Sequence, residues 1–170
     1  MYRHILYPTD GSTGSEAAMA HVRELATEFD ATVHVLHVVD TRHVGLGMSG
    51  GYLSGSGSGL SGTEIEGEES GMVGKRIDPD EQEETFVDRA RPFVEETAAE
   101  FDDVDTVPAV KSGNPHEVIL EYVDDHDIDL VVMGTHGRTG VERYLLGSVS
   151  EKGVRMADPP VMTVSARDGG

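Results

Sequence analysis

Glycines and a serine follow a strongly apolar stretch in the second half of the chain. The segment MGTHGRTGVERYLLGSVS, residues 133–150, contains Gly134, Gly137, Gly140, Gly147 and Ser148. A glycine directly after a strand lets the backbone turn tightly and approach a ligand closely. Ser148 opens a predicted helix, where unpaired backbone N–H groups and the positive end of the helix dipole favour an anion. The pattern therefore predicts a site for phosphate groups.

Local charge also favours an anion at this loop. The loop at residues 134–147 contains His136, Arg138 and Arg143 but one acid, Glu142, in a chain with 32 acidic and 13 basic residues. A purely structural alternative stays open, in which the glycines serve loop turns and Ser148 only caps its helix. No Walker A sequence occurs, and the first strand–helix turn reads PTDGSTG where dinucleotide-binding folds have the G-x-G-x-x-G fingerprint.

The elements that must position this loop alternate between strands and helices. Apolar runs predict strands at residues 4–7, 31–39, 104–110, 128–133 and 161–166. Helices begin at the capping boxes Thr13-x-x-Glu16 and Ser148-x-x-Glu151 and at the proline-containing segments 78–81 and 114–117. Pro92 lies inside the second helix, where we expect a kink or a break. The alternation predicts one α/β domain, with a mostly parallel sheet and helices on both faces.

Ligands of such sheets bind beyond the carboxyl ends of the strands. Asp10 follows the first predicted strand, Val38 lies at the end of the second, and Gly134 follows the fourth. Their turns meet in one crevice if the first and fourth strands are neighbours. The sequence alone leaves that adjacency open.

A combination of motifs points to a known family. The pattern G-x2-G-x9-G-[ST], met by Gly134, Gly137, Gly147 and Ser148, occurs together with ILYPTDGS, VLHVVD and SGNPHEVI. In this combination the chain resembles the universal stress protein family, and its glycine motif resembles that of the ATP-binding branch. The resemblance covers residues 3–164 except for the segment 42–77.

The resemblance implies a fold, a ligand and a partner. It implies a doubly wound domain with a five-stranded sheet in the order 3-2-1-4-5. The implied ligand is ATP or another adenine nucleotide, with Mg²⁺ or Mn²⁺ carried by its phosphates. It further implies a homodimer paired through the last strand, residues 161–166, although an ordinary edge strand is the alternative.

The resemblance also implies which residues contact the nucleotide. Asp10 is matched to the acid that meets the nucleoside, with Pro8, Thr9 and Ser12 beside it, and the backbone of Val38 to the adenine edge. The phosphate loop and the helix start comprise Met133, Gly134, Gly137, Arg138, Gly140, Gly147, Ser148, Val149 and Ser150. A structural alternative for Asp10 is an Asx turn that leads into the first helix. No residue is assigned a catalytic or metal-ligating role.

The histidines and methionines do not suggest a site of their own. His34 and His37 lie three residues apart on a predicted strand and so face opposite sides. None of the eight histidines shows metal-ligand spacing, and the chain has no cysteine. We interpret Met133, Met156 and Met162 as core residues.

Residues 42–77 interrupt the compact pattern. The segment contains GLGMSGGYLSGSGSGLSG and then the acidic EIEGEESG, a composition typical of flexible coil. The alternative is a lid or a partner-docking loop, because the segment follows the second strand on the nucleotide side of the sheet. Its apolar residues Met48, Tyr52, Leu53 and Leu60 would then form the contact.

The net charge and the amino-terminal sequence indicate which partners and which compartment to expect. The net charge of −19 disfavours nucleic acid and anionic membranes as partners. We interpret the acidic excess as adaptation to a salty cytoplasm, where a Debye length of about 3 Å at 1 M salt mutes self-repulsion. No signal-peptide pattern or bilayer-length apolar run occurs, so we expect a cytoplasmic protein.

Three functions remain open on the sequence. The first is a nucleotide-dependent dimeric switch in stress regulation, the second a slow ATPase, and the third a nucleotide-free dimeric scaffold. Asp10 at the nucleoside end is badly placed to act as a base on the phosphates, and Glu142 is the one acid in the glycine loop. Binding is therefore favoured over turnover.

Overall fold

The computed structural model describes residues 1–41, 79–135 and 148–166. Its elements follow one another in the order β1(His4–Pro8), α1(Thr13–Phe29), β2(Thr32–Asp40), α2(Pro79–Ala99), β3(Thr106–Gly113), α3(Pro115–Asp125), β4(Leu130–Gly134), α4(Ser148–Met156) and β5(Val161–Val164). The predicted alternation of strands and helices is confirmed over these residues. The predicted insertion, residues 42–77, lies outside them.

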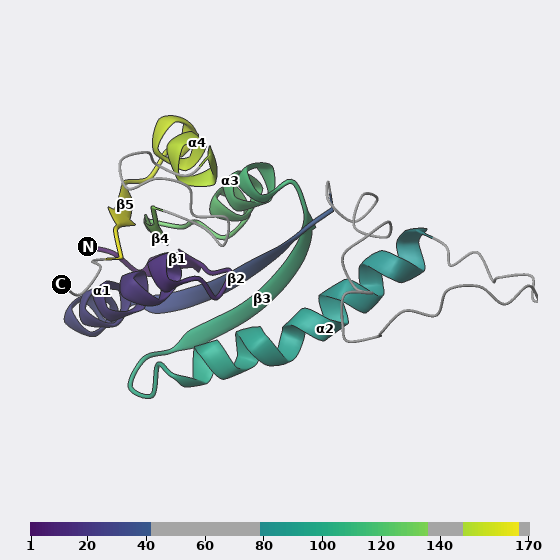
Figure 1. The fold of residues 1–170 in the computed structure, drawn as a ribbon. Helices are drawn as coiled ribbons and strands as arrows, with labels where there is room; N and C mark the ends of the chain where they lie inside the picture. Colours follow the sequence, from purple (N-terminus) through teal and green to yellow (C-terminus); the bar gives the residue numbers. More distant parts are fainter. Residues whose placement is uncertain (42–78, 136–147, 167–170) are drawn as a thin grey trace, which may run out of the picture.

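The five strands form one parallel sheet in the order β3-β2-β1-β4-β5. Strand β1 lies at its centre, with Tyr7 beside Val35 of β2 and Leu6 beside Val131 of β4. Helices α1 and α2 cover one face of the sheet, and α3 and α4 cover the other (Figure 1). The expected strand order is confirmed, and with it the adjacency of the first and fourth strands.

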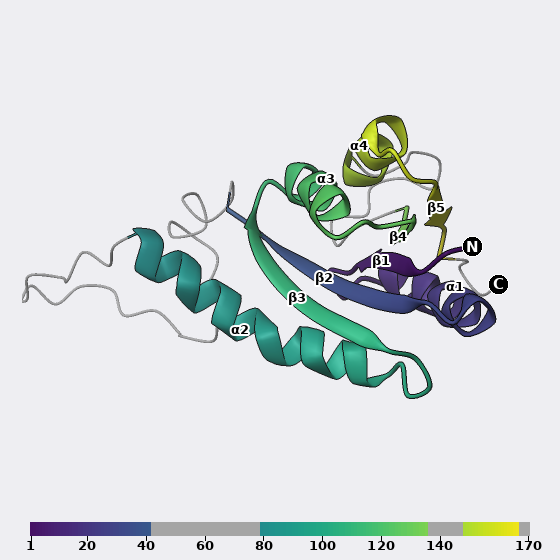
Figure 2. The same ribbon diagram turned by 180° about the vertical axis from the view of Figure 1, so that it is seen from behind.

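Two apolar layers enclose the central strand. Ile5 and Tyr7 pack in the layer beneath α1 and α2, whereas Leu6 packs in the layer beneath α3. All three side chains are 0% exposed. A strand buried on both faces needs a continuous apolar run rather than alternation, which explains the sequence HILY. The view from behind shows the same layers with α3 and α4 on one side of the sheet (Figure 2).

Helix α2 continues through its internal proline. It runs from Pro79 to Ala99 without interruption, so a break at Pro92 is wrong, and the alternative of a kink stays a prediction. Pro92 lacks the N–H that would bond to the carbonyl of Asp88. Both residues are exposed, so water can take the place of the missing donor. The lost hydrogen bond therefore does not end the helix.

The cap of α1 also differs from the prediction. Ser12, not Thr13, is the N-cap residue, and its Oγ accepts a hydrogen bond from the Ser15 backbone N–H at 3.3 Å. The backbone N–H of Ser12 donates to Oδ1 of Asp10, which fixes the serine in an extended conformation in front of the helix. Helix α4 likewise begins with Ser148 as its first residue, so its cap position precedes the described residues.

The three methionines do not share one environment. Met133 is 3% exposed and belongs to the core, as predicted. Met156 is 61% exposed and Met162 is 37% exposed, so the prediction is wrong for these two. Met156 is the last residue of α4, and Met162 lies on β5, which pairs with a strand on one side only in the described part of the chain.

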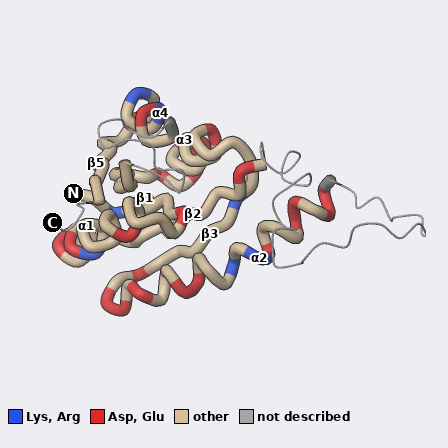
Figure 3. The backbone as a smooth tube through the Cα atoms, viewed as in Figure 1, with Lys and Arg blue, Asp and Glu red and all other residues tan. Residues whose placement is uncertain are grey.

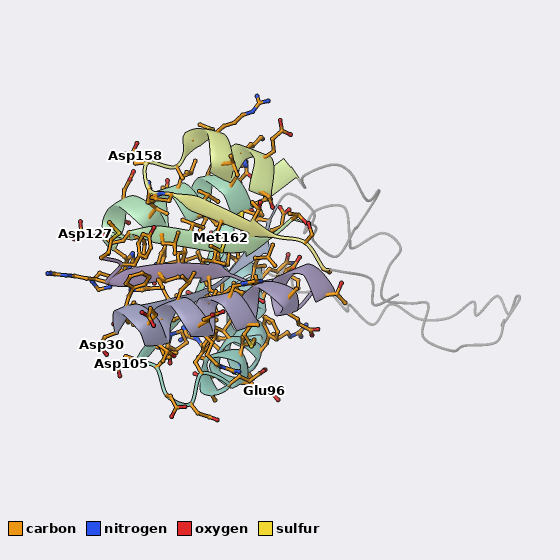
Figure 4. The ribbon with its side chains drawn as sticks, turned by 90° about the vertical axis from the view of Figure 1, so that its left-hand side faces the viewer. Asp30, Glu96, Asp105, Asp127, Asp158 and Met162 are labelled. Atoms are coloured by element: carbon orange, nitrogen blue, oxygen red, sulfur yellow. The ribbon has the colours of Figure 1, made fainter. Side chains whose placement is uncertain are left out.

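Aspartate and glutamate residues are spread along the described backbone (Figure 3). On α2 they outnumber the two arginines, Arg89 and Arg91. The four acids Asp30, Asp105, Asp127 and Asp158 each lie shortly before a strand, and Figure 4 shows them at one end of the molecule. That end is where the strands begin. In the described ranges, no helix is both long and apolar enough to span a bilayer.

Candidate functional site

Four chain segments, from β1, β2, β4 and α4, meet at the carboxyl end of the central strands. Strand β1 ends at Pro8, and its neighbour β4 ends at Gly134. On the other side of β1, the last pair with β2 joins Pro8 to Leu36. The start of α4 reaches the same edge, because Ser150 Oγ donates a hydrogen bond to the carbonyl oxygen of Gly134 at 2.7 Å. The adjacency of β1 and β4, on which the predicted meeting of the turns after the first, second and fourth strands depends, is therefore present in the fold.

Most of the predicted contact residues are described. They are Pro8, Thr9, Asp10, Ser12, Val38, Met133, Gly134, Ser148, Val149 and Ser150. Gly137, Arg138, Gly140 and Gly147 lie outside the described residues, so the central part of the phosphate loop stays a prediction.

Thr9 anchors the turn between β1 and α1. Its backbone N–H donates to the Leu36 carbonyl at 2.8 Å, and its Oγ1 donates to Ser15 Oγ at 3.2 Å. Its carbonyl oxygen lies 2.8 Å from Nδ1 of His37. Because a carbonyl only accepts, that ring nitrogen must carry the hydrogen. Thr9 is 6% exposed, and all three of its polar groups are bonded within the protein.

Asp10 follows this anchor and forms an Asx turn. Its Oδ1 accepts a hydrogen bond from the Ser12 backbone N–H at 3.0 Å. The structural alternative from the sequence is thus confirmed for one carboxylate oxygen. This bond also holds the half-exposed carboxylate at the carboxyl end of the sheet. Contact between Asp10 and a nucleoside remains a prediction.

The peptide groups of Val38 extend beyond the end of β1. Strands β1 and β2 pair no further than Pro8 with Leu36, and the Leu36 carbonyl then receives the N–H of Thr9. Alternate residues of a strand direct their N–H and C=O groups to the same side. Val38 therefore directs its backbone groups toward the β1 side, past the last β1–β2 pair. This position suits hydrogen bonds to the edge of a planar base.

Apolar side chains line the α3 side of this end. Val38 and Val149 are partly buried against the core layer that contains Leu36 and Met133. This edge therefore combines apolar side chains with backbone polar groups, a composition that suits a planar, partly polar ligand.

Gly134 has a packing role that the sequence did not reveal. A Cβ atom at this position would lie 2.5 Å from the carbonyl carbon of Gly14 and 2.8 Å from the backbone nitrogen of Ser15. Tyr7 fixes the same turn of α1, because its hydroxyl donates to the Ser15 carbonyl at 2.7 Å. The glycine thus permits close contact between two protein segments.

The strongest pKa perturbation lies away from this edge. Burial, and then the neighbouring His4 and His126, lower the pKa of His34 to about 4. His34 Nδ1 lies 3.0 Å from the Tyr122 hydroxyl, and burial raises the pKa of that phenol. These groups lie on the α3 face beside the first residues of β1, so their titration bears on stability.

No metal cluster appears in the part of the chain that the structure describes. Within residues 1–41, 79–135 and 148–166, no three histidine or acidic side chains are grouped to hold an ion. His34 and His37 face opposite sides of β2, as expected, because His34 contacts Tyr122 of α3 and His37 contacts Phe93 of α2.

Sequence reasoning missed three residues that shape this edge, namely Ser15, His37 and Gly14. The sequence did place His37 directly before Val38. Because neighbours on a strand face opposite sides, a residue next to a ligand contact can support that contact from the other face of the sheet. The contact of Gly14 with Gly134 had no comparable signal, because it joins two segments far apart in the chain.

Comparisons with known proteins agree with this arrangement. The model of the Universal stress protein family matches residues 1–165. Universal stress protein MJ0577 of Methanocaldococcus jannaschii is 31% identical over 170 residues, covering 99% of this chain and 98% of that protein. Its solved structure superimposes with a TM-score of 0.74 at 27% identity, covering 99% of each chain.

Two more distant structures share the fold. One is a universal stress protein family protein from Arabidopsis thaliana with AMP bound, at a TM-score of 0.56 and 17% identity, covering 98% of this chain and 93% of that one. The other is a universal stress protein in complex with cAMP, at a TM-score of 0.57 and 17% identity, covering 98% of each chain. Since the family model spans nearly all of the sequence and MJ0577 matches it from end to end, this chain belongs to the universal stress protein family.

Proposed function

We propose that this chain binds an adenine nucleotide at the carboxyl end of β1, β2 and β4, and that it acts as a nucleotide-dependent dimeric switch in stress regulation. One observation carries the proposal: the peptide groups of Val38 extend past the end of β1, beside the bonded turn of Thr9 and Asp10. A base can hydrogen-bond to the peptide groups of Val38, and a ribose can reach the carboxylate of Asp10.

The phosphates are assigned to the start of α4. Ser148 begins this helix, and the bond from Ser150 to the Gly134 carbonyl holds the first turn of the helix against the end of β4. The backbone N–H groups of a first helical turn attract an anion. The proposed glycine loop, with Gly137, Arg138, Gly140 and Gly147, would complete the contacts. Relatives with AMP and cAMP support an adenylate, and the resemblance favours ATP with Mg²⁺ or Mn²⁺.

Binding without rapid turnover follows from where the described acids lie. Hydrolysis needs a group that orients water at the terminal phosphate. Asp10 is held by its Asx turn at the nucleoside end, and Glu151 on the first turn of α4 pairs with Arg155 at 3.0 Å. Of these two acids, Asp10 lies at the nucleoside end and Glu151 is paired with Arg155, so we assign neither to the orientation of water. Slow ATP hydrolysis is the second candidate function.

The dimer is assigned to strand β5. It pairs with β4 through Val161 to Val164, and in the described part of the chain no strand pairs with its other edge. Met162 lies on this edge in Figure 4, and α4 beside it exposes Val154 and Met156. An unpaired edge next to exposed apolar side chains suits pairing with a second copy.

Thermal melting with ligands tests the binding proposal. Protein freed of carried-over ligand is melted in concentrated KCl with ATP, ADP, AMP, cyclic AMP or FMN, with and without Mg²⁺. A ligand present at 100 times its Kd should stabilise the fold by about 2.7 kcal/mol. If millimolar adenylates produce neither a shift nor calorimetric heat, the nucleotide proposal is wrong. Phosphate release at about 1 per second would favour the enzyme, since typical enzymes turn over at such rates or faster.

A further inference from the structure

The carbonyl oxygen of Thr9 is held by a histidine from the neighbouring strand. His37 Nδ1 lies 2.8 Å from that oxygen. His37 directs its side chain to the α2 face of the sheet, whereas the next residue, Val38, packs against the opposite face. The ring therefore acts from behind the proposed pocket and lies outside the predicted set of contact residues.

A phenylalanine from α2 supports the same turn. The rings of Phe93 and His37 meet edge to face, with centroids 5.5 Å apart and an interplanar angle of 80°. Phe93 also lies under Gly11, where a Cβ atom would be 3.3 Å from its ring. Gly11 has a φ of +71°, a conformation that favours glycine. Two elements that are distant in sequence, β2 and α2, thus fix the turn between β1 and α1.

The Thr9 carbonyl controls the direction in which Asp10 leaves the strand. The C=O of Thr9 and the N–H of Asp10 belong to one rigid, planar peptide unit. The amide and the hydroxyl of Thr9 are already bonded, to Leu36 and Ser15. The bond from His37 therefore fixes the remaining freedom of this peptide plane, and with it the starting direction of the Asp10 side chain.

We propose that His37 is a positioning residue of the nucleoside pocket, whose Nδ1–H holds the Thr9–Asp10 peptide so that Asp10 and the backbone of Val38 face one nucleoside. The inference rests on the proposed nucleotide site. It assigns His37 an effect on the base and ribose part of the ligand, and none on the phosphates, which are assigned to the far side of the pocket at α4.

Two variants separate this role from general packing. His37→Phe keeps a ring beside Phe93 but removes the donor. His37→Asn restores a donor, because the amide nitrogen of asparagine occupies nearly the place of Nδ1. Loss of one hydrogen bond should weaken the binding of ATP and of adenosine by about three- to tenfold in His37→Phe. Tripolyphosphate should bind both variants within twofold of the parent chain, and His37→Asn should recover most of the adenosine affinity.

Calorimetry in concentrated KCl measures the affinities of ATP, adenosine and tripolyphosphate for the parent chain and for both variants. His21→Phe, on the exposed face of α1, is the control. An unchanged adenosine affinity in His37→Phe overturns the role of His37, and so does an equal loss for tripolyphosphate. If the parent chain itself binds no adenylate, the proposed function fails and the positioning role fails with it. The parent measurement therefore distinguishes the two failures.

Discussion

The Cα atom of Gly134 lies so close to Gly14 that a methyl group on it would be 2.5 Å from the Gly14 carbonyl carbon. The end of β4 therefore passes directly against the first turn of α1. The same glycine is the first position of the predicted phosphate motif. Because it has no side chain, Gly134 lets the end of β4 pack against the first turn of α1, whether or not a ligand is bound.

Replacing Gly134 by alanine should destabilise the ligand-free protein. The added methyl group has backbone atoms as its nearest neighbours, so α1 or β4 must move, and overpacking of this kind costs about 1–3 kcal/mol. Gly153→Ala is the matched control, because its Cβ would lie 3.6 Å from the side chain of Met133. In the interior of α4, that alanine should be neutral or stabilising by up to about 1 kcal/mol. Urea denaturation in concentrated KCl measures both, and equal effects would contradict the packing role.

Replacing Asp10 by asparagine should separate its two roles. Asparagine keeps the oxygen that accepts from the Ser12 N–H, so the turn and the melting temperature should change little. The loss of charge should weaken ATP binding by about five- to tenfold, because hydrogen bonds to a charged group are stronger by about 1 kcal/mol. Asp30→Asn, at the opposite end of the sheet, is the control. Titration calorimetry that finds the same ATP affinity in Asp10→Asn and the parent chain would assign Asp10 to structure alone.

The fold followed from the sequence more completely than its boundaries did. Alternating patterns and turn residues placed every described helix and strand in order, but β3 was expected at residues 104–110 and lies at Thr106–Gly113. The carboxyl end of β3 is a strand because Lys111 and Ser112 pair with Val38 and Val39 of β2. That partner is remote in the chain, so local propensity gave no sign of it. Val104 instead bonds back to Phe101 in the preceding turn.

In the candidate site, too, features set by the local sequence could be predicted, whereas contacts between segments far apart in the chain could not. Asp10, Val38 and Gly134 could be placed at one edge because each follows or ends a predicted strand. The hydrogen bond from His37 to the Thr9 carbonyl could not be predicted, since it depends on the register between β1 and β2. The cap of α1 was misassigned to Thr13 because adjacent hydroxyl residues compete for that role, and the Asx turn of Asp10 selects Ser12.

Replacing Met162 by glutamate should disrupt the proposed dimer. A charge in the middle of β5 would have to be desolvated against a second copy, whereas on a free edge it would stay in water. Val107→Glu is the matched control, because Val107 is 40% exposed on β3 at the opposite edge of the sheet. Sedimentation velocity in concentrated KCl should show a monomer for Met162→Glu and a dimer for Val107→Glu. A parent chain that is monomeric at all concentrations would remove β5 as the partner surface.

His34 lies in a buried group of rings that should make stability depend on pH. It is 6% exposed, with its Nε2 3.3 Å from His4 Nδ1 and its Nδ1 3.0 Å from the Tyr122 hydroxyl. The ring centroid of His126 lies 5.6 Å from that of His34, and the His126 ring stacks on Tyr122. The backbone N–H of His4, the first residue of β1, donates to Asp129 Oδ2. Burial first, and then the charges of His4 and His126, lower the pKa of His34 from 6.5 to about 4. The folded protein therefore resists a proton that the unfolded chain accepts.

The sign of the effect follows from this difference. Well above pH 6.5 neither state holds the proton on His34, so the full stability is present. As the pH falls through 6.5 toward 4, the unfolded chain gains the proton first, and the free energy of unfolding should decrease by about 2 kcal/mol between pH 7.5 and 5. Urea denaturation at constant KCl measures this slope. His34→Gln should flatten it, while His21→Gln, which removes an exposed histidine of α1, should keep it. A slope that survives His34→Gln would show that acid destabilisation arises elsewhere in the molecule.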